Sequence, residues 1–132
     1  YEKISKSTGL KYDVIINIQG DEPLLDPEQL MILQGLFTDE YIMMGTLVSP
    51  VTNPLDLDNE SEAFVVFDKK KNALYFSRSV IPYLRGVNRA QWFDNHTFYK
   101  HVGMYAYTPE ALEIFASLPI SKLETICNKA KK

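Results

Sequence analysis

The residues DVIINIQGDEPLLDP, Asp13 to Pro27, decide how this chain is organised. Their first part, Asp13 to Ile18, is mostly β-branched and almost wholly apolar. Such a run without alternation is typical of a strand buried on both faces of a parallel sheet. A polar break with one glycine follows at Gln19 to Pro23, and Asp26 then offers the N-cap of a helix. The stretch therefore predicts a strand–loop–helix unit of an α/β fold.

The polar break carries the side chains that indicate a function. In α/β sheets, ligands bind beyond the carboxyl ends of the strands, which is where we expect Gln19, Asp21 and Glu22. Two carboxylates and an amide, beside a glycine at position 20 that lets backbone come close, suit a divalent cation and a phosphorylated ligand. Glycine, aspartate and proline are also common in ordinary solvated turns, so on composition alone both interpretations stay open.

Pattern and caps predict the elements on either side of this unit. A helix is expected over 1–9, ended by Gly9, and another from Asp26 onward with an apolar face made of Leu30, Ile32, Leu33, Leu36 and Phe37. The apolar run Ile42 to Pro50 is then expected to return to the sheet, parallel to the first strand through a right-handed crossover.

The second half of the chain predicts a hairpin, a long strand and a capped helix. The hairpin joins 62–67 to 73–76 through a charged tip, and the strand covers 99–107. The helix begins at Thr108 and Pro109 and is expected to face inward through Leu112, Phe115 and Leu118. Between hairpin and strand lies an irregular segment over 77–98, and segments of this length are usually functional or disordered.

Composition limits the classes of protein to consider. The 132 residues, 45% of them hydrophobic, allow one core, so we expect a single domain over 1–132. A net charge of −3 argues against a nucleic-acid binder, and no apolar stretch approaches the roughly 20 residues that span a bilayer. The lone Cys127 permits no internal disulfide, which fits the reducing cytoplasm. The chain begins at Tyr1 rather than Met, and we expect it to be a piece of a longer protein.

Three blocks of the sequence resemble the 3-deoxy-manno-octulosonate (Kdo) cytidylyltransferases, the CMP-Kdo synthetases. The blocks are QGDEP at Gln19 to Pro23, ALYFSRSVIPY at Ala73 to Tyr83 and KHVGMYAYTPEAL at Lys100 to Leu112, in the family's order and approximate spacing. The match runs from about residue 10 to residue 118, the middle of a typical member. It implies a Rossmann-like α/β nucleotidyltransferase fold with a mixed, mainly parallel sheet and helices on both faces, truncated at both ends.

The resemblance implies Mg²⁺-dependent transfer of CMP from CTP to Kdo, giving CMP-Kdo for lipopolysaccharide biosynthesis. In that reaction an anomeric hydroxyl attacks the α-phosphate of CTP and pyrophosphate leaves, so catalysis is mostly positioning and charge stabilisation. By analogy with the family, Asp21 is the magnesium ligand and a catalytic residue. Gln19, Gly20 and Glu22 then belong to the substrate site, although Glu22 is also suited to holding the loop through backbone amides.

Two further blocks supply the remaining candidate residues. Arg78 is the candidate for binding the carboxylate or phosphate of a substrate and for assisting catalysis, because a guanidinium matches both anions in bidentate fashion. His101 and Tyr105 are substrate-binding residues by resemblance. The alternatives are a surface arginine at Arg78, a histidine satisfied by backbone near the core at His101, and core packing for Tyr105.

The chain also departs from the family. Phe64 stands where the family has a lysine, which would place an apolar ring where a cation faces the ligands. The triphosphate-binding loop upstream and the second magnesium aspartate downstream have no counterpart here, and the agreement ends after Glu124. We therefore expect little or no turnover from these 132 residues alone. A non-catalytic binding module and a cytidylyltransferase for another acidic sugar, such as a sialic acid, remain as alternatives.

Members of the family are usually homodimers. The irregular segment after Arg78, where Trp92 and Phe93 interrupt polar residues, is the expected place for such a contact. A mobile flap over the site is the alternative for the same segment.

Overall fold

The computed structural model describes residues 1–19, 26–122 and 124–125. The elements follow in the order α1 Glu2–Thr8, β1 Ile15–Ile18, α2 Pro27–Leu36, β2 Met44–Pro50, η1 Pro54–Asp58, β3 Phe64–Phe67, β4 Ala73–Ser77, η2 Arg89–Gln91, α3 Trp92–Asn95, β5 Tyr99–Tyr107 and α4 Pro109–Ser117. The predicted strand over 99–107 is confirmed as β5, and the predicted hairpin is confirmed as β3 and β4.

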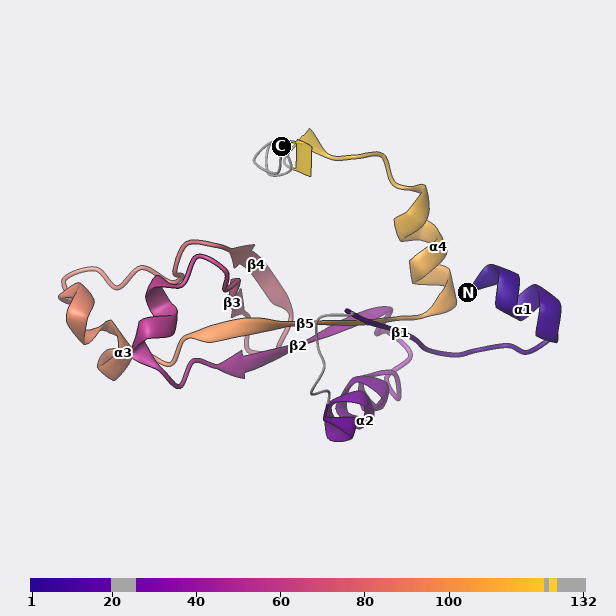
Figure 1. Ribbon diagram of the computed structural model, residues 1–132, viewed down its shortest axis with the longest axis horizontal. Coiled ribbons are helices and arrows are strands. Elements are labelled where there is room, and N and C mark those ends of the chain that lie inside the picture. Colours follow the sequence, from indigo (N-terminus) through magenta and orange to yellow (C-terminus); the bar gives the residue numbers. More distant parts are fainter. Residues whose placement is uncertain (20–25, 123, 126–132) are drawn as a thin grey trace.

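The long strand β5 organises the sheet (Figure 1). It pairs with β1 through Ile15↔Tyr107 and with β2 through Met44↔Tyr107, and β3 joins it at Phe64↔Lys100. Every pairing among the described strands is antiparallel, so the expected mainly parallel pairing is wrong for this part of the sheet. Strands β1 and β2 do run in the same direction, but β5 inserts between them from the opposite direction and makes both contacts antiparallel.

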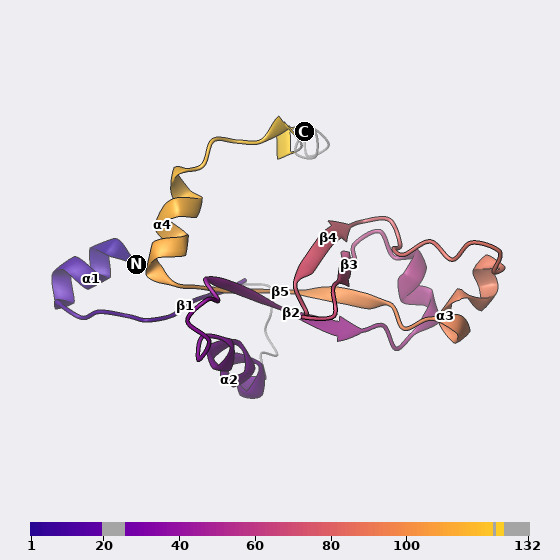
Figure 2. The ribbon, with the colours of Figure 1, turned by 180° about the vertical axis from the view of Figure 1, so that it is seen from behind.

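Helices lie on both faces of the sheet, as the resemblance implied. Figures 1 and 2 show α2 against one side of β1 and β5, and α4 on the other side. Helix α2 begins where the sequence predicts, because the Asp26 carboxylate accepts a hydrogen bond of 2.9 Å from the Glu28 backbone N–H and Pro27 occupies the first turn. The α/β fold class is therefore confirmed, with a correction to its strand pairing.

Helix α2 packs through one stripe of apolar residues. Leu33 is fully buried against Met104 and Ala106 of β5, and the cluster is completed by Val14, Ile16, Leu30, Leu36, Phe37, Leu47 and Val102. The sequence predicts that Ile32 faces this core, but its side chain is 52% exposed. Like Met31, it lies on the solvent side of the helix. On α4, Phe115 and Leu118 are likewise exposed, against the prediction, although the Phe115 ring still contacts Tyr107 at 6.2 Å between centroids.

The first predicted strand is less covered than expected. Ile15 and Ile16 are half-buried, whereas Asn17 and Ile18 are exposed. Helix α2 covers one face of β1 through Val14 and Ile16, and this one-sided cover explains why the apolar run is not buried on both faces among the described residues.

A second core lies at the other end of β5, and the irregular segment over 77–98 packs against it. It consists of Val51, Leu57, Phe64, Trp92 and Phe98. The Trp92 indole N–H donates to the Val87 carbonyl at 3.0 Å and its ring is stacked with Phe98, which leaves it only 5% exposed. Trp92 is therefore a core residue of its own chain, and a dimer contact in the segment after Arg78 stays a prediction. Phe64 is also fully buried in this cluster, so its ring faces the core and not a ligand.

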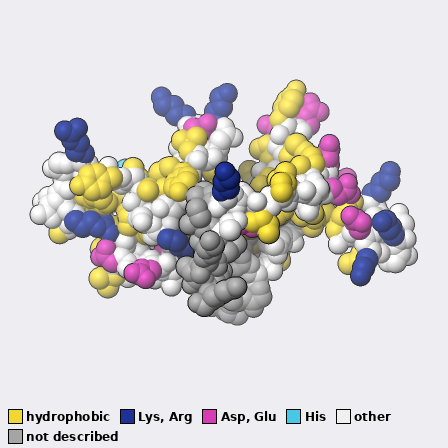
Figure 3. Space-filling view, turned by 90° about the horizontal axis from the view of Figure 1, so that it is seen from above, with side chains coloured by type: hydrophobic (Ala, Val, Ile, Leu, Met, Phe, Trp, Pro, Cys, Tyr) yellow, Lys and Arg dark blue, Asp and Glu magenta, His cyan; other side chains and the backbone are white. Residues whose placement is uncertain are grey.

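The visible surface is mixed in character. Seen from the side of α4, hydrophobic side chains lie exposed between interspersed basic and acidic ones (Figure 3). Strand β4 contributes to the exposed apolar surface through Leu74, Tyr75 and Phe76. Among the helices in the described ranges, none has the length and apolar character needed to cross a membrane.

Candidate functional site

The face of β5 opposite α2 gathers several of the predicted site residues. His101 and Tyr105 alternate along this face, with 5.0 Å between their ring centroids. Gln19 continues β1 past the Ile18↔Met104 pair and lies over Gly103, where its Oε1 would be 3.2 Å from an added Cβ. Residues far apart in sequence thus share one surface: an amide, an imidazole and a phenol.

The loop residues Gly20, Asp21 and Glu22 lie outside the described residues. Their assignment to the substrate and metal site therefore stays a prediction. Within the parts of the chain that the structure describes, no group of three or more His, Cys, Asp or Glu side chains is arranged to hold a metal ion.

The imidazole of His101 is held by Thr46 of β2. The distance from His101 Nε2 to Thr46 Oγ1 is 2.8 Å, and the same hydroxyl lies 2.6 Å from the Met104 carbonyl oxygen. A hydroxyl has one proton, and a carbonyl can only accept, so the Thr46 proton goes to Met104 and His101 must donate from Nε2. The neutral ring then carries its acceptor lone pair on Nδ1. The alternative of a histidine satisfied by backbone does not apply to this ring, because its partner is a side-chain hydroxyl.

The electrostatic surroundings favour the neutral form of His101. Burial lowers the pKa of His101 below its usual 6.5, and the positive charge of Arg78 lowers it further. Hydrogen bonds place the two residues near each other, because the Arg78 side chain donates to the Ser61 carbonyl and the His101 backbone N–H donates to the Ala63 carbonyl at 2.8 Å. The Phe76 ring meets the imidazole edge-on at 5.3 Å and adds to its burial.

Arg78 stands at the end of β4 and is anchored at one point. Its Nη1 donates to the carbonyl oxygen of Ser61, in the loop that leads into β3. Arg78 is exposed, as in the alternative of a surface arginine, but its side chain is held by a specific backbone acceptor. The guanidinium therefore has a defined position and keeps donors for an anion.

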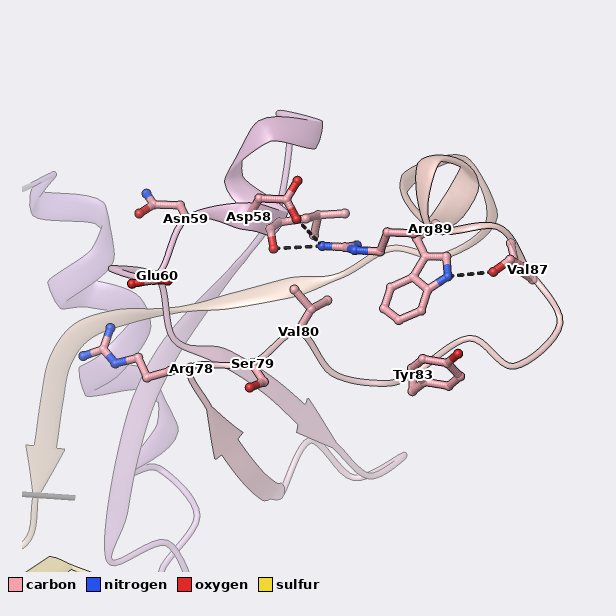
Figure 4. Close-up of a pocket in the computed structure, with 11 residues that line it drawn as sticks. Asp58, Asn59, Glu60, Arg78, Ser79, Val80, Tyr83, Val87 and Arg89 are labelled. Carbon is pink, nitrogen blue, oxygen red and sulfur yellow. Dashed lines mark hydrogen bonds and ion pairs between the residues drawn. The ribbon is translucent and has the colours of Figure 1, made fainter. Parts of the chain in front are cut away.

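Arg78 also lines a cleft of about 480 Å³ at the end of the hairpin (Figure 4). One wall comes from the loop at Asp58, Asn59 and Glu60, and the other from Ser79, Val80 and Tyr83. The remaining lining residues are Leu57, Val87, Arg89 and Trp92. Arg89 pairs with Asp58 at 2.6 Å and its guanidinium lies 4.7 Å from the centre of the Trp92 ring.

Sequence reasoning found Arg78 but missed the cleft beside it. Ser79, Val80 and Tyr83 all belong to the block ALYFSRSVIPY, so the block itself was the available signal. Thr46 was also missed, since a threonine in an apolar strand carries no mark of function. Only the pairing of β2 with β5 brings it to His101.

Together these groups form a surface suited to a polyhydroxylated anion. Arg78 offers a cation for a carboxylate, while His101 Nδ1, the Gln19 amide and the Tyr105 hydroxyl offer hydrogen-bonding partners for hydroxyl groups.

Several known proteins are similar to this chain in sequence. The 3-deoxy-manno-octulosonate cytidylyltransferase of Parabacteroides distasonis is 44% identical over 128 residues, which are 94% of this chain and 49% of that protein. The same enzyme of Bacteroides thetaiotaomicron is 45% identical over 127 residues, 94% of this chain and 50% of the relative. An 8-amino-3,8-dideoxy-manno-octulosonate cytidylyltransferase of Shewanella woodyi is 42% identical over 122 residues, 89% of this chain and 47% of the relative.

A solved structure agrees with these sequence matches. A CMP:2-keto-3-deoxy-manno-octonic acid synthetase complexed with CTP superimposes with a TM-score of 0.77 at 33% identity, covering 94% of this chain and 48% of that one. The chain thus spans about half the length of the relatives it matches. A family model described as cytidylyltransferase matches residues 2–130. The resemblance found in the three sequence blocks is confirmed, and this chain belongs to the cytidylyltransferase family.

Proposed function

We propose that this chain forms the sugar-acid-binding portion of a cytidylyltransferase that transfers CMP from CTP to Kdo. The observation that carries the proposal is that Arg78 and the half-buried His101 are bonded to carbonyls two residues apart, Ser61 and Ala63, while Gln19 and Tyr105 share the face of His101. The names of the relatives, which are cytidylyltransferases for Kdo and for its 8-amino derivative, support the choice of substrate.

Each residue has a role that follows from its chemistry. Arg78 binds the sugar carboxylate through two parallel N–H donors and thereby fixes the sugar's orientation. His101, held by Thr46, accepts a hydrogen bond at Nδ1 from a sugar hydroxyl. Gln19 and Tyr105 hydrogen-bond to further hydroxyls. Held in this way, the anomeric hydroxyl loses little freedom when it attacks the α-phosphate of CTP and displaces pyrophosphate.

The proposal includes Asp21 as a ligand of Mg²⁺. The loop after β1 offers carboxylate and amide oxygens, the hard donors that Mg²⁺ prefers, and Mg²⁺ commonly needs only one or two protein carboxylates when phosphates and water complete its shell. The described residues offer no competing cluster of metal-binding side chains. When bound, the ion would neutralise the negative charge of the nucleotide phosphates.

The proposal also includes the setting of the reaction. A product of this kind serves lipopolysaccharide biosynthesis, and the lone Cys127 is consistent with a cytoplasmic protein. A homodimer remains part of the proposal for the intact protein, with exposed surface such as Tyr83, rather than Trp92, available for a contact.

Calorimetry on the purified chain tests the proposal. We expect Kdo to bind, and Arg78→Met to weaken its binding at least about tenfold, as for the loss of a charge-assisted hydrogen-bonded pair. Arg85→Met is the matched control. Arg85 is an exposed arginine of the following segment, and its replacement removes the same charge. Equal loss in both variants, or no binding of Kdo by the unaltered chain, would contradict the proposed role of Arg78.

The alternatives predict different titrations. Binding of Kdo without binding of CTP in the presence of Mg²⁺ would favour a non-catalytic sugar-acid module. Tighter binding of a sialic acid or of the 8-amino sugar would favour a cytidylyltransferase for that acidic sugar. Formation of CMP-Kdo from CTP and Kdo by the 132-residue chain would show that these residues suffice for turnover, against our expectation.

A further inference from the structure

The segment that anchors Arg78 is itself strongly acidic. Its acids recur at every second position, as Asp56, Asp58, Glu60 and Glu62. The Ser61 carbonyl accepts from Arg78, so four carboxylates lie on the short stretch of chain to which the candidate anion-binding guanidinium is tied. An arginine beside so many acids is expected to pair with one of them, which would occupy the donors that a substrate carboxylate needs.

Two other cations pair with three of these four acids, and the fourth, Glu60, lines the same cleft as Arg78. Lys100 Nζ lies 2.9 Å from Glu62 Oε1 and 3.1 Å from Asp56 Oδ2, and Arg89 pairs with Asp58 at 2.6 Å. None of the ion pairs found in the described ranges includes Arg78. Asp58 and Arg89 are seen paired across the cleft wall in Figure 4, with Arg78 turned to the other end of the cleft.

The Lys100 pairs are the more enclosed of the two sets. The side chains of Lys100, Asp56 and Glu62 are 27%, 25% and 23% exposed, whereas Arg89 and Asp58 are 42% and 77% exposed. The pKa of Lys100 is raised chiefly by its hydrogen bond to Glu62, against the opposing effect of burial. A partly buried carboxylate that lost this partner would carry an unpaired charge, which costs free energy. Pairing with another cation would lower that cost.

The backbone places Glu62 between the two candidate site residues. Ser61 accepts from the Arg78 side chain, and the Ala63 carbonyl accepts from the His101 N–H at 2.8 Å. Glu62, between them, is held by Lys100, the neighbour of His101 in β5. The Arg78 side chain is thus hydrogen-bonded to the residue next to Glu62 in the chain, which makes its guanidinium a candidate partner for a released Glu62 carboxylate.

From this arrangement we propose that Lys100 is a positioning residue: by holding Glu62, it keeps that carboxylate from Arg78 and leaves the guanidinium open to the carboxylate of an acidic sugar. The inference deepens the proposed function and rests on it for the identity of the ligand. The pairing of charges itself is a property of the unliganded chain and is testable without any sugar.

The first test is an NMR measurement of the Arg78 Nε–H resonance, assigned through Arg78→Lys. Lys100→Met is expected to shift this resonance as Glu62 moves onto the guanidinium. The double variant Lys100→Met with Glu62→Gln is expected to show the Arg78 Nε–H resonance at its position in the unaltered chain. The matched control is Lys100→Met with Asp56→Asn, which restores the same net charge but leaves Glu62 ionised, and which is expected to keep the shifted resonance.

The second test repeats these variants with Kdo in calorimetry. Lys100→Met is expected to weaken Kdo binding at least about tenfold, Lys100→Arg to preserve it, and Glu62→Gln to rescue Lys100→Met where Asp56→Asn does not. Lys70→Met, which removes an exposed lysine from the β3–β4 turn, is expected to bind like the unaltered chain. Circular dichroism checks folding, and Lys100→Gln, which keeps a donor without the charge, replaces Lys100→Met if that variant does not fold.

The outcomes separate this inference from the proposed function. Equal rescue by Asp56→Asn and Glu62→Gln would show a general effect of charge and overturn the assignment of Lys100. An unmoved Arg78 resonance in Lys100→Met, or in Lys100→Gln where it is used, would overturn it as well. If the unaltered chain binds no Kdo while the Arg78 resonance responds as expected, the charge arrangement stands and the proposed ligand is wrong.

Discussion

His101 donates from Nε2 to the hydroxyl of Thr46, at 2.8 Å, because the Thr46 proton is committed to the Met104 carbonyl at 2.6 Å. This relationship joins β2 to the site face of β5 and fixes the tautomer of the one imidazole among the candidate residues. It also makes Thr46 a specific target for testing the site.

Replacing Thr46 by Val tests the tautomer. The change removes the acceptor of Nε2 and the donor to the Met104 carbonyl, so we expect it to lower the pKa of His101 further and to destabilise the fold by about 1–3 kcal/mol. Thr46→Ser keeps the hydroxyl and is expected to behave like the unaltered chain. Nitrogen NMR of the His101 ring measures the pKa and the tautomer, and urea unfolding measures the stability; a neutral ring protonated at Nδ1 in the unaltered chain would contradict the assignment.

The lowered pKa of His101 predicts a loss of stability on acidification. The unfolded chain takes up a proton at the usual pKa of 6.5, while the folded chain takes it up only at lower pH. Between these two values the unfolded state binds more protons, so the free energy of unfolding falls as the pH falls. Urea unfolding at a series of pH values below 7 is expected to show this slope in the unaltered chain and to lose it in His101→Gln. His96→Gln, which removes the other histidine, is expected to keep it.

The packing of α2 predicts opposite results at two adjacent residues. Leu33 is fully buried against Met104 and Ala106, whereas Ile32 is 52% exposed. Leu33→Ala is expected to lower the free energy of unfolding by about 2–5 kcal/mol, because it removes buried methyl groups and leaves a cavity. Ile32→Ala is expected to change it by no more than about 0.5 kcal/mol, as for an exposed position. Urea unfolding decides, and similar losses at both positions would refute this orientation of the helix.

The buried Phe64 predicts that the family's lysine is not tolerated at this position. Its side chain is wholly enclosed by the core that includes Leu57, Trp92 and Phe98. Phe64→Lys would bury an ammonium group without a partner, so we expect it to destabilise the fold by more than about 4 kcal/mol. Phe64→Leu is expected to cost far less, since it stays apolar. A folded Phe64→Lys variant with tighter CTP binding would instead show that the side chain reaches the ligands.

Local sequence signals predicted the element boundaries well, because each rests on contacts between near neighbours. Asp26 caps α2 through Glu28, Thr108 caps α4 through Ala111, and Gly9 ends α1 in a left-handed conformation with φ of 69°. The Asp68 side chain accepts from the backbone of Lys70 and Asn72, which explains the hairpin turn between β3 and β4. Such contacts span four residues or fewer and are visible in the sequence.

The candidate site was predictable only in part. The blocks containing Arg78, His101 and Tyr105 pointed to the right family, and the structure ties Arg78 and His101 to carbonyls two residues apart, Ser61 and Ala63. Thr46 gave no such signal, and Lys100 lay in a quoted block without any mark of its role, because the roles of both depend on partners 55 and 38 positions away. Asp21 remains a prediction.

The caps, the turn, the long strand over 99–107 and the family could be predicted from the residues alone, since these depend on near neighbours or on quoted motifs. Only the tertiary structure decided that β5 inserts between β1 and β2 and pairs antiparallel with both. The same insertion placed Phe64 in a core and Lys100 between two carboxylates. The physical reason is that strand order and charge pairing depend on residues distant in the chain, whose approach is set by the burial of the whole sheet and not by any local pattern.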